Sequence, residues 1–125
     1  MKSAIIEKSI QQPFNEVYAT LRKNITSSGF LLLHEINTQS IVSKYGISIK
    51  PLKQLLFFHP DYIEKITRQD ILAINEIPIK IVIAEMDNGS VSVSFPNPEN
   101  NLSDYNLDSG IGKDLLNRTL KILDM

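Results

Sequence analysis

Apolar residues recur along the chain with two different periods, and these periods predict its strands and helices. Two β-branched runs, at 79–86 and 90–95, flank the pair Asn88-Gly89. That pair predicts a hairpin with a two-residue primed turn, because both central positions of such a turn favour Asn and Gly. The centre of the fold is therefore predicted to be an antiparallel sheet.

Further apolar runs predict three more strands, at residues 3–10, 30–36 and 52–58. Helical spacing predicts a long helix that opens at Pro13 and ends at Gly29, and a terminal helix from about Asp108. The remaining segments are predicted as short helices at 38–45 and after His59, an irregular or helical turn at 70–76, and a solvated loop at 97–104. This order of elements indicates a single α+β domain over residues 1–125.

The strands differ in how apolar their two faces are. Side chains alternate between the faces of a strand, so each face can be read separately. The last strand has one apolar face and one wet face, and the wet face carries Ser90, Ser92 and Ser94. In the strand at 30–36, alternation places Leu32 with His34 on one face and Leu31 with Glu35 on the other.

Three of the five predicted strands are apolar on both faces, yet the two long helices can cover only one face of the sheet. The terminal helix is predicted to bury Ile111, Leu115, Leu116, Leu120 and Leu123. An exposed apolar patch of roughly several hundred Å² is uncommon on a monomer. We therefore expect the second face, around Leu31, Leu33, Leu56 and Phe58, to be covered by the short middle helices, by a second subunit or by a ligand.

The composition is that of an ordinary globular domain. The 125 residues are 42% hydrophobic, and thirteen basic against fourteen acidic residues give a net charge of −1. No cluster of basic residues could neutralise phosphates, so we expect no nucleic-acid partner. No apolar run approaches the roughly 20 residues that cross a bilayer, so we expect no membrane partner. The chain has no cysteine, which removes disulfides and is typical of a cytoplasmic protein.

Several short motifs, taken in order, resemble a bacterial and archaeal family known as domain of unknown function 302. They are Gly29-Phe30, Glu35-Ile36-Asn37, Lys44-Tyr45-Gly46, Leu55-Leu56-Phe57-Phe58-His59-Pro60, Ile77-Pro78-Ile79-Lys80-Ile81, and the set Glu85, Asp87, Gly89, Val91, Val93 and Pro98. The resemblance covers most of residues 1–123. The chain departs from the family at His59, where Asn is common, and at Asn37, where Asp is frequent.

This resemblance implies a small β-α-β(4)-α domain. Its curved antiparallel sheet would have helices packed on one face, similar to a single copy of the TATA-binding-protein-like fold. The resemblance also implies a homodimer in many members, and no known activity. The nucleic-acid binding of that similar fold does not follow, because fold does not imply function.

Five residues are candidates for a ligand-binding site: His59, Tyr62, Glu35, Glu85 and His34. Glu35 and Glu85 could form a carboxylate pair for acid–base chemistry if their strands are neighbours. The two histidines would need a third ligand, such as one of these glutamates, to hold a metal. A capping role explains His59 equally well, and exposed strand ends explain the glutamates. We expect no metal and no cofactor.

Two other features are weaker. Tyr45 and Tyr18 could line a pocket with their polar tips, although the helical spacing of Tyr18 favours a place in the core. The segment Gly110-Ile111-Gly112-Lys113 faintly resembles a phosphate loop, but it lacks the Walker spacing and a strand directly before it. Its place at the start of the terminal helix explains it better.

These observations favour a non-enzymatic homodimer that binds a small ligand or a protein partner at the apolar second face. One alternative is a hydrolase-like or metal-dependent enzyme that uses His59 with Glu35 or Glu85. The other is a purely structural assembly module. An enzyme needs a histidine, a carboxylate and a hydroxyl in one cleft, whereas a binding module needs only a pocket with few polar groups.

Overall fold

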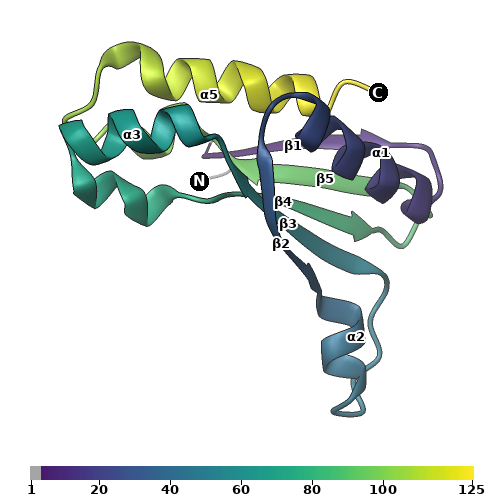
Figure 1. The fold of residues 1–125 in the computed structure, drawn as a ribbon. Coiled ribbons are helices and arrows are strands. Elements are labelled where there is room, and N and C mark those ends of the chain that lie inside the picture. Colours follow the sequence, from purple (N-terminus) through teal and green to yellow (C-terminus); the bar gives the residue numbers. More distant parts are fainter. Residues whose placement is uncertain (1–3) are drawn as a thin grey trace.

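A five-stranded antiparallel sheet with helices on one side forms the body of the molecule (Figure 1). The computed structural model describes residues 4–125, so the predicted start of the first strand at Ser3 lies outside the described residues. The strands are β1 (Ile5–Ile10), β2 (Leu31–Asn37), β3 (Leu52–Phe58), β4 (Ile79–Glu85) and β5 (Val91–Pro96). The helices are α1 (Phe14–Ser27), α2 (Thr38–Ser43), α3 (Pro60–Gln69), the 3₁₀ helix η2 (Ile71–Glu76), α4 (Pro98–Leu102) and α5 (Ser109–Ile122). The predicted α+β class is confirmed.

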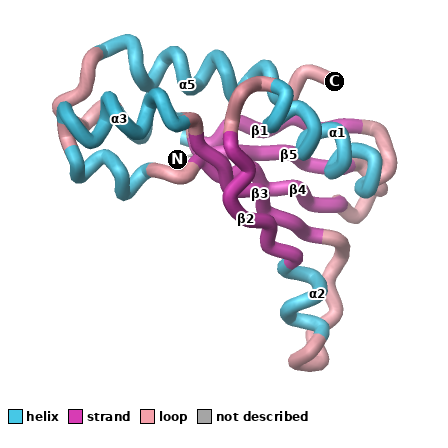
Figure 2. The backbone as a smooth tube through the Cα atoms, in the orientation of Figure 1, coloured by secondary structure: helices cyan, strands magenta, loops and turns pink. Residues whose placement is uncertain are grey.

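The strand order in the sheet is β1-β5-β4-β3-β2, and each strand runs antiparallel to its neighbours. The four strands from β2 to β5 follow one another in sequence, whereas β1 crosses over to pair with β5 (Figure 2). Consequently β2 and β1 form the two edges of the sheet. We call the side that carries α1, α3 and α5 the helix face, and the opposite side the open face.

The hydrophobic core lies between the sheet and the helices. Its strand residues are Ile10, Leu55, Phe57, Ile79, Ile81, Ile83, Val91, Val93 and Phe95, all buried. From α1 it receives Val17, Leu21 and Ile25, which recur at the spacing expected for one helical stripe. Gly29 follows this helix with φ +87°, which confirms the predicted left-handed cap, while Pro13 is the residue before the first helical position.

A β-bulge in β2 overturns the predicted faces of that strand. The pairing with β3 shifts between Leu32 and His34, so Leu33 is the extra residue. Leu32 pairs opposite Phe57 and therefore shares the helix face with Glu35, whereas His34 pairs opposite Leu56 on the open face. Simple alternation fails here because the extra residue shifts the faces of the side chains before it relative to those after it.

The turn between β4 and β5 also differs from the prediction. Gly89 has φ +84°. Among residues 4–125 only glycines have a positive φ, so Asn88 does not adopt the conformation that a primed turn requires. The amide of Gly89 donates to the carbonyl of Met86 at 2.9 Å, and the amide of Met86 donates to the carbonyl of Ser90 at 2.8 Å. The hairpin therefore has a three-residue loop that ends in a left-handed glycine.

Residues 97–104 form a helix rather than the predicted solvated loop. The side chain of Asn97 accepts hydrogen bonds from the amides of Glu99 and Asn100, which starts α4 at Pro98. Pro98 and Leu102 are buried. The segment was expected to be solvated because its composition is polar, yet the cap and the two buried residues determine its structure.

Burial differs from the predictions in α5 and around the start of β5. In α5 the buried side includes Thr119 and Ile122, while Leu120 is 41% exposed. The prediction that Ser90 and Ser92 lie on a wet face is wrong, because these residues are only 3% and 9% exposed. Their hydroxyls donate hydrogen bonds to the side chains of Asn88 and Glu7. No helix among residues 4–125 is long and apolar enough to cross a membrane.

An arm projects from the sheet between β2 and β3 (Figure 1). It consists of α2 and the loop after it, and it begins where Asn37 caps the helix by accepting a hydrogen bond from the amide of Ser40. Ile41, Tyr45 and Ile47 are 48%, 80% and 51% exposed. The candidate pocket residue Tyr45 therefore lies on the arm, and it lines none of the pockets described below.

Candidate functional site

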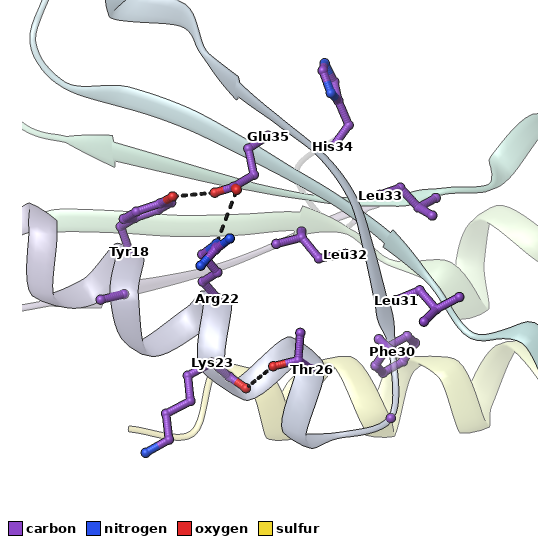
Figure 3. A pocket seen from close by; sticks show the side chains of 12 residues that line it. Tyr18, Arg22, Lys23, Thr26, Phe30, Leu31, Leu32, Leu33, His34 and Glu35 are labelled. Carbon is purple, nitrogen blue, oxygen red and sulfur yellow. Dashed lines mark hydrogen bonds and ion pairs between the residues drawn. The ribbon is translucent and has the colours of Figure 1, made fainter.

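A groove of about 990 Å³ lies between α1 and the edge strand β2. Figure 3 shows the residues that line it. One wall comes from α1 and carries Tyr18, Ala19, Arg22, Lys23 and Thr26. The other wall is the continuous segment from Gly29 to Glu35.

The helical period explains why these α1 residues face the groove. The apolar positions Val17, Leu21 and Ile25 are fully buried against the sheet. Arg22 and Lys23 follow Leu21 and therefore lie on the outward side of the helix, where they are exposed. The groove thus has a polar helix wall and a leucine-rich strand wall.

Glu35 is the centre of a small polar network at one end of the groove (Figure 3). The hydroxyl of Tyr18 donates a short hydrogen bond to one of its carboxylate oxygens. The Nε of Arg22 donates to the other oxygen at 3.2 Å. The Nζ of Lys53 lies 3.7 Å from the centroid of the Tyr18 ring, a cation–π contact. Tyr18 is therefore half-buried and polar in role, not the core residue that its spacing predicted.

The network raises the pKa of Tyr18 above its ordinary value of 10.0. The hydrogen bond to Glu35 is the largest cause, followed by loss of solvent and by the negative charge of Glu35, while Arg22 acts in the opposite direction. Because folding raises this pKa, the protonated phenol stabilises the fold at pH values below the unfolded pKa. That contribution is lost as the pH rises through the folded pKa.

We expect Glu35→Gln to lower the pKa of Tyr18 towards 10.0, because the substitution removes the charge and weakens the hydrogen bond. An alkaline titration followed by the ¹³Cζ resonances of tyrosine measures this shift. Tyr105 is the internal control, since its raised pKa depends chiefly on a hydrogen bond to Glu76. A Tyr18 titration curve that is unchanged in the variant would contradict the network.

Glu85 does not join Glu35. The strands that carry them, β4 and β2, lie on opposite sides of β3 and are not neighbours. Glu85 instead lines a second hollow of about 480 Å³, together with Pro51 and Lys53. The condition for a carboxylate pair is therefore not met.

His59 and Tyr62 belong to a packed aromatic cluster rather than to an open cleft. The Nδ1 of His59 accepts a hydrogen bond from the amide of Asp61 at 3.2 Å, which caps α3. Its ring makes edge-to-face contacts with Phe30 and Tyr62, at centroid distances of 5.7 and 5.5 Å. The ring of His59 also lies against Gly29: a Cβ atom added at Gly29 would lie 3.4 Å from the Nε2 of His59.

Tyr62 joins α3 to α5. It is buried, and its hydroxyl donates a short hydrogen bond to a carboxylate oxygen of Asp114. The guanidinium of Arg118 lies 5.5 Å from the Tyr62 ring centroid and 3.8 Å from the same carboxylate. This arrangement closes the space between the helices and leaves Tyr62 no free polar group.

His34 lines the same groove as Glu35, but its side chain lies on the open face of the sheet. Figure 3 shows its ring on the far side of β2 from Tyr18 and Arg22, and it is exposed. Of the five candidates, His59 and Tyr62 make a ring contact, and Glu35 and His34 line the same groove. Within residues 4–125, no group of three or more histidine, aspartate and glutamate side chains is arranged to hold a metal ion.

The family model for domain of unknown function DUF302 matches residues 6–125. The chain belongs to the DUF302 family. A similar solved structure is the crystal structure of the uncharacterized conserved protein DUF302 from Bacillus stearothermophilus, with a TM-score of 0.86. The match covers 97% of this chain and 96% of that chain at 19% sequence identity, and this similarity shows the fold alone. A search of curated proteins found no match.

Membership of DUF302 confirms the resemblance seen in the motifs, and the structure accounts for the two departures from them. Both positions are helix caps: the side chains of His59 and Asn37 accept hydrogen bonds from the first turns of α3 and α2. The Nδ1 of His59 can replace the oxygen of an asparagine in this role, and Asn and Asp are comparable caps.

Sequence reasoning missed Arg22 and Lys23 as groove residues of this DUF302 domain. Their positions are the polar positions of an amphipathic helix, where charged residues are ordinary. Only the location of β2 at the edge of the sheet makes them part of a wall. The sequence carried one usable signal, the three consecutive leucines at 31–33. Because alternate side chains point to opposite faces, this run makes both faces of the strand apolar.

Proposed function

We propose that this DUF302 domain is a non-enzymatic homodimeric binding module, and that a second copy covers its open sheet face. The observation that carries the proposal is the location of the helices. Of the helices between residues 4 and 125, those that pack on the sheet lie on the helix face, and the open face has no covering element (Figure 1).

The apolar part of the open face is concentrated on β2, β3 and β4. Its members, placed there by the strand register, are Leu31, Ile36, Leu52, Leu56, Phe58, Val82 and Ala84. Leu31 is 49% exposed, and the others are half-buried by their neighbours in the sheet. A contiguous patch of this kind is typical of an interaction surface. We call it the apolar patch.

The opposite half of the open face is polar, so the apolar patch has a boundary. The hydroxyl of Ser92 on β5 donates to a carboxylate oxygen of Glu7 on β1 at 2.6 Å. Ser9 and Ser94 lie on the same face by register. A second copy presents an apolar patch of equal size, so a two-fold interface matches like with like.

The enzymatic alternative has less support. It requires His59 to converge with Glu35 or Glu85, but the Nδ1 of His59 already accepts the amide of Asp61. The hydroxyl of Tyr18 and the guanidinium of Arg22 likewise engage Glu35. The Nδ1 of His59 and the carboxylate of Glu35 thus already have partners within the fold.

Phe58→Glu is expected to convert the dimer into monomers, because it places a charge in the apolar patch that would have to be buried without a partner. Sedimentation velocity at about 10 μM measures the mass, with the wild type expected at twice the 14.1 kDa of one chain. Ser9→Glu is the matched control. It adds the same charge to the polar half of the same face, and its mass should equal that of the wild type.

Circular dichroism and a thermal melt of each variant separate loss of association from loss of folding. A wild-type protein that remains monomeric at this concentration would refute the dimer. A folded Phe58→Glu variant that remains dimeric would place the interface elsewhere.

A further inference from the structure

The pair Asn88-Gly89 is a motif that the fold leaves without a role. It predicted a primed turn, but Asn88 lacks the positive φ for which asparagine is favoured in such a turn. Both residues are exposed. What distinguishes the pair from other exposed polar residues is its chemistry, because an amide side chain is followed by a residue that has no side chain.

An asparagine before a glycine places an electrophile beside a nucleophile. The electrophile is the side-chain Cγ of Asn88, and the nucleophile is the backbone nitrogen of Gly89. When this nitrogen loses its proton and attacks, a Cγ–N bond forms and a succinimide ring closes. The side-chain nitrogen takes up the proton and leaves as ammonia. Glycine permits the attack best, because no Cβ atom crowds the approach.

Water completes the reaction by opening the ring at either of its two carbonyl carbons. Cleavage between the Gly89 nitrogen and Cγ gives aspartate with an unchanged main chain. Cleavage between the same nitrogen and the main-chain carbonyl carbon of residue 88 gives isoaspartate, in which the main chain runs through Cγ. Water is the co-reactant, and the sequence of steps needs no oxidant, reductant or cofactor.

Three hydrogen bonds hold both reacting groups in place in what we call the closed loop, residues 86–90. The Oδ1 of Asn88 accepts from the amide of Ser90 at 3.0 Å and from its hydroxyl at 2.6 Å. The amide of Gly89 donates to the carbonyl of Met86 at 2.9 Å. A backbone carbonyl is too weak a base to remove this proton. The closed loop therefore keeps the nucleophile protonated and fixes the side chain that it would attack.

The closed loop lies where it can open without unfolding the sheet. Residues 86–89 are exposed, and a Cβ atom added at Gly89 would meet nothing within 4 Å. The pairing between β4 and β5 reaches its end at Glu85 and Val91, before the loop begins. Exposed segments with few packing contacts open at low free energy. Opening of this segment frees the Gly89 nitrogen while the strands remain paired.

We infer that Asn88 is a self-modification site, at which opening of the loop lets the Gly89 nitrogen attack Cγ and convert the asparagine to isoaspartate and aspartate. The hydrogen bonds from Ser90 and to Met86 set how rarely this occurs. The inference does not depend on the proposed function, because the loop belongs to one chain and reacts without a partner.

The two products affect the hairpin differently. Aspartate keeps the main chain, and its carboxylate can still accept the hydrogen bonds of Ser90, so the loop closes again. Isoaspartate adds a carbon atom to the main chain between Met86 and Ser90, so the hydrogen bonds across the loop lose their spacing. Either product adds one negative charge. Isoaspartate therefore leaves a lasting change at the turn between two central strands.

Peptide mapping by mass spectrometry after incubation at mildly alkaline pH measures the conversion of each asparagine from amide to acid. Methylation by an isoaspartyl methyltransferase distinguishes isoaspartate from aspartate. In the folded wild type, we expect Asn88 to be converted before the other asparagines, none of which precedes a glycine. The same chain unfolded in guanidinium chloride is expected to react faster at Asn88, because the closed loop no longer forms.

Ser90→Ala removes one of the two donors to Asn88. In the folded protein it should speed the reaction about two- to tenfold, the change in opening that the loss of one hydrogen bond produces. Ser94→Ala is the matched control, because Ser94 lies on the same strand and by alternation on the same face, but away from the loop. Its rate should equal that of the wild type. In guanidinium chloride all three chains should react at one rate.

Three results would overturn the inference. One is a folded wild type in which Asn88 remains intact while the unfolded chain is converted, and another is faster conversion at a different asparagine. The third is a folded Ser90→Ala variant, verified by circular dichroism, that reacts no faster than the wild type. Comparison of the folded with the unfolded wild type tests the protection without any variant, and equal rates in the two states would refute it.

Discussion

Replacing Gly112 with alanine is expected to destabilise the domain by about 1–3 kcal/mol, the usual cost of forcing extra volume into a packed interior. The same substitution at Gly110, two residues earlier, is expected to stabilise it by roughly 0.5–1 kcal/mol, because alanine is the better helix former. The two glycines lie in the first turn of one helix, α5, and differ in their surroundings.

Close packing of two helices explains the difference. A Cβ atom at Gly112 would lie 2.9 Å from the Cα of Glu99 and 3.4 Å from the carbonyl oxygen of Pro98, both in the backbone of α4. Backbone cannot rotate away as a flexible side chain can, so α4 and α5 must separate. A Cβ atom at Gly110 would meet nothing within 4 Å.

Urea unfolding of the wild type and both variants measures the two changes in the free energy of unfolding. Opposite signs are the expected result. If both variants are stabilised, α4 moves freely against α5 and the contact has no energetic weight. This contact also accounts for the Gly-Ile-Gly-Lys segment, in which the second glycine allows helix packing and is not part of a phosphate loop.

Gly89→Val is expected to cost of order 1–3 kcal/mol, the usual penalty for holding a β-branched residue in a left-handed conformation. Gly89 has φ +84°, and an added Cβ atom would meet no other atom within 4 Å. The cost therefore comes from the backbone alone. Gly89→Asn is the matched control, because asparagine tolerates this conformation better than other residues with a side chain.

Thermal melts should place the asparagine variant between the wild type and the valine variant. Equal melting temperatures for valine and asparagine would show that steric strain at φ is not the cause. An unchanged melting temperature for valine would show that the loop rearranges at no cost. Because the turn joins two central strands of the sheet, we expect the whole domain to respond.

The sequence predicted those elements whose periodicity is continuous. The stripe of Val17, Leu21 and Ile25 placed α1, and the alternation of Ile79, Ile81 and Ile83 placed the buried face of β4. These patterns work because each residue is related to the next by the geometry of one element alone. The order of the strands in the sheet depends on pairings between elements, and the sequence did not predict it.

The features that sequence reasoning missed depend on contacts between elements. The bulge at Leu33 is defined by its pairing with β3, and Asn-Gly is compatible with more than one hairpin loop. The groove depends on which strand lies at the edge, so nothing local marks Lys23 as one of its residues. Of the five candidate residues, His59 and Tyr62 were found together, but in a packed cluster rather than in a cleft.

The position of β1 has a consequence for the order of assembly. Strands β2 to β5 each pair with the strand next to them in the chain, but β1 pairs Ile5 with Pro96 and Ile10 with Val91. Closing so long a loop costs entropy before any contact repays it, and such distant pairings slow folding. During synthesis the first strand has no partner until β5 has left the ribosome. Once β5 emerges, it is an edge strand rich in valine until β1 pairs with it, and the nascent chain is most exposed to aggregation in that interval.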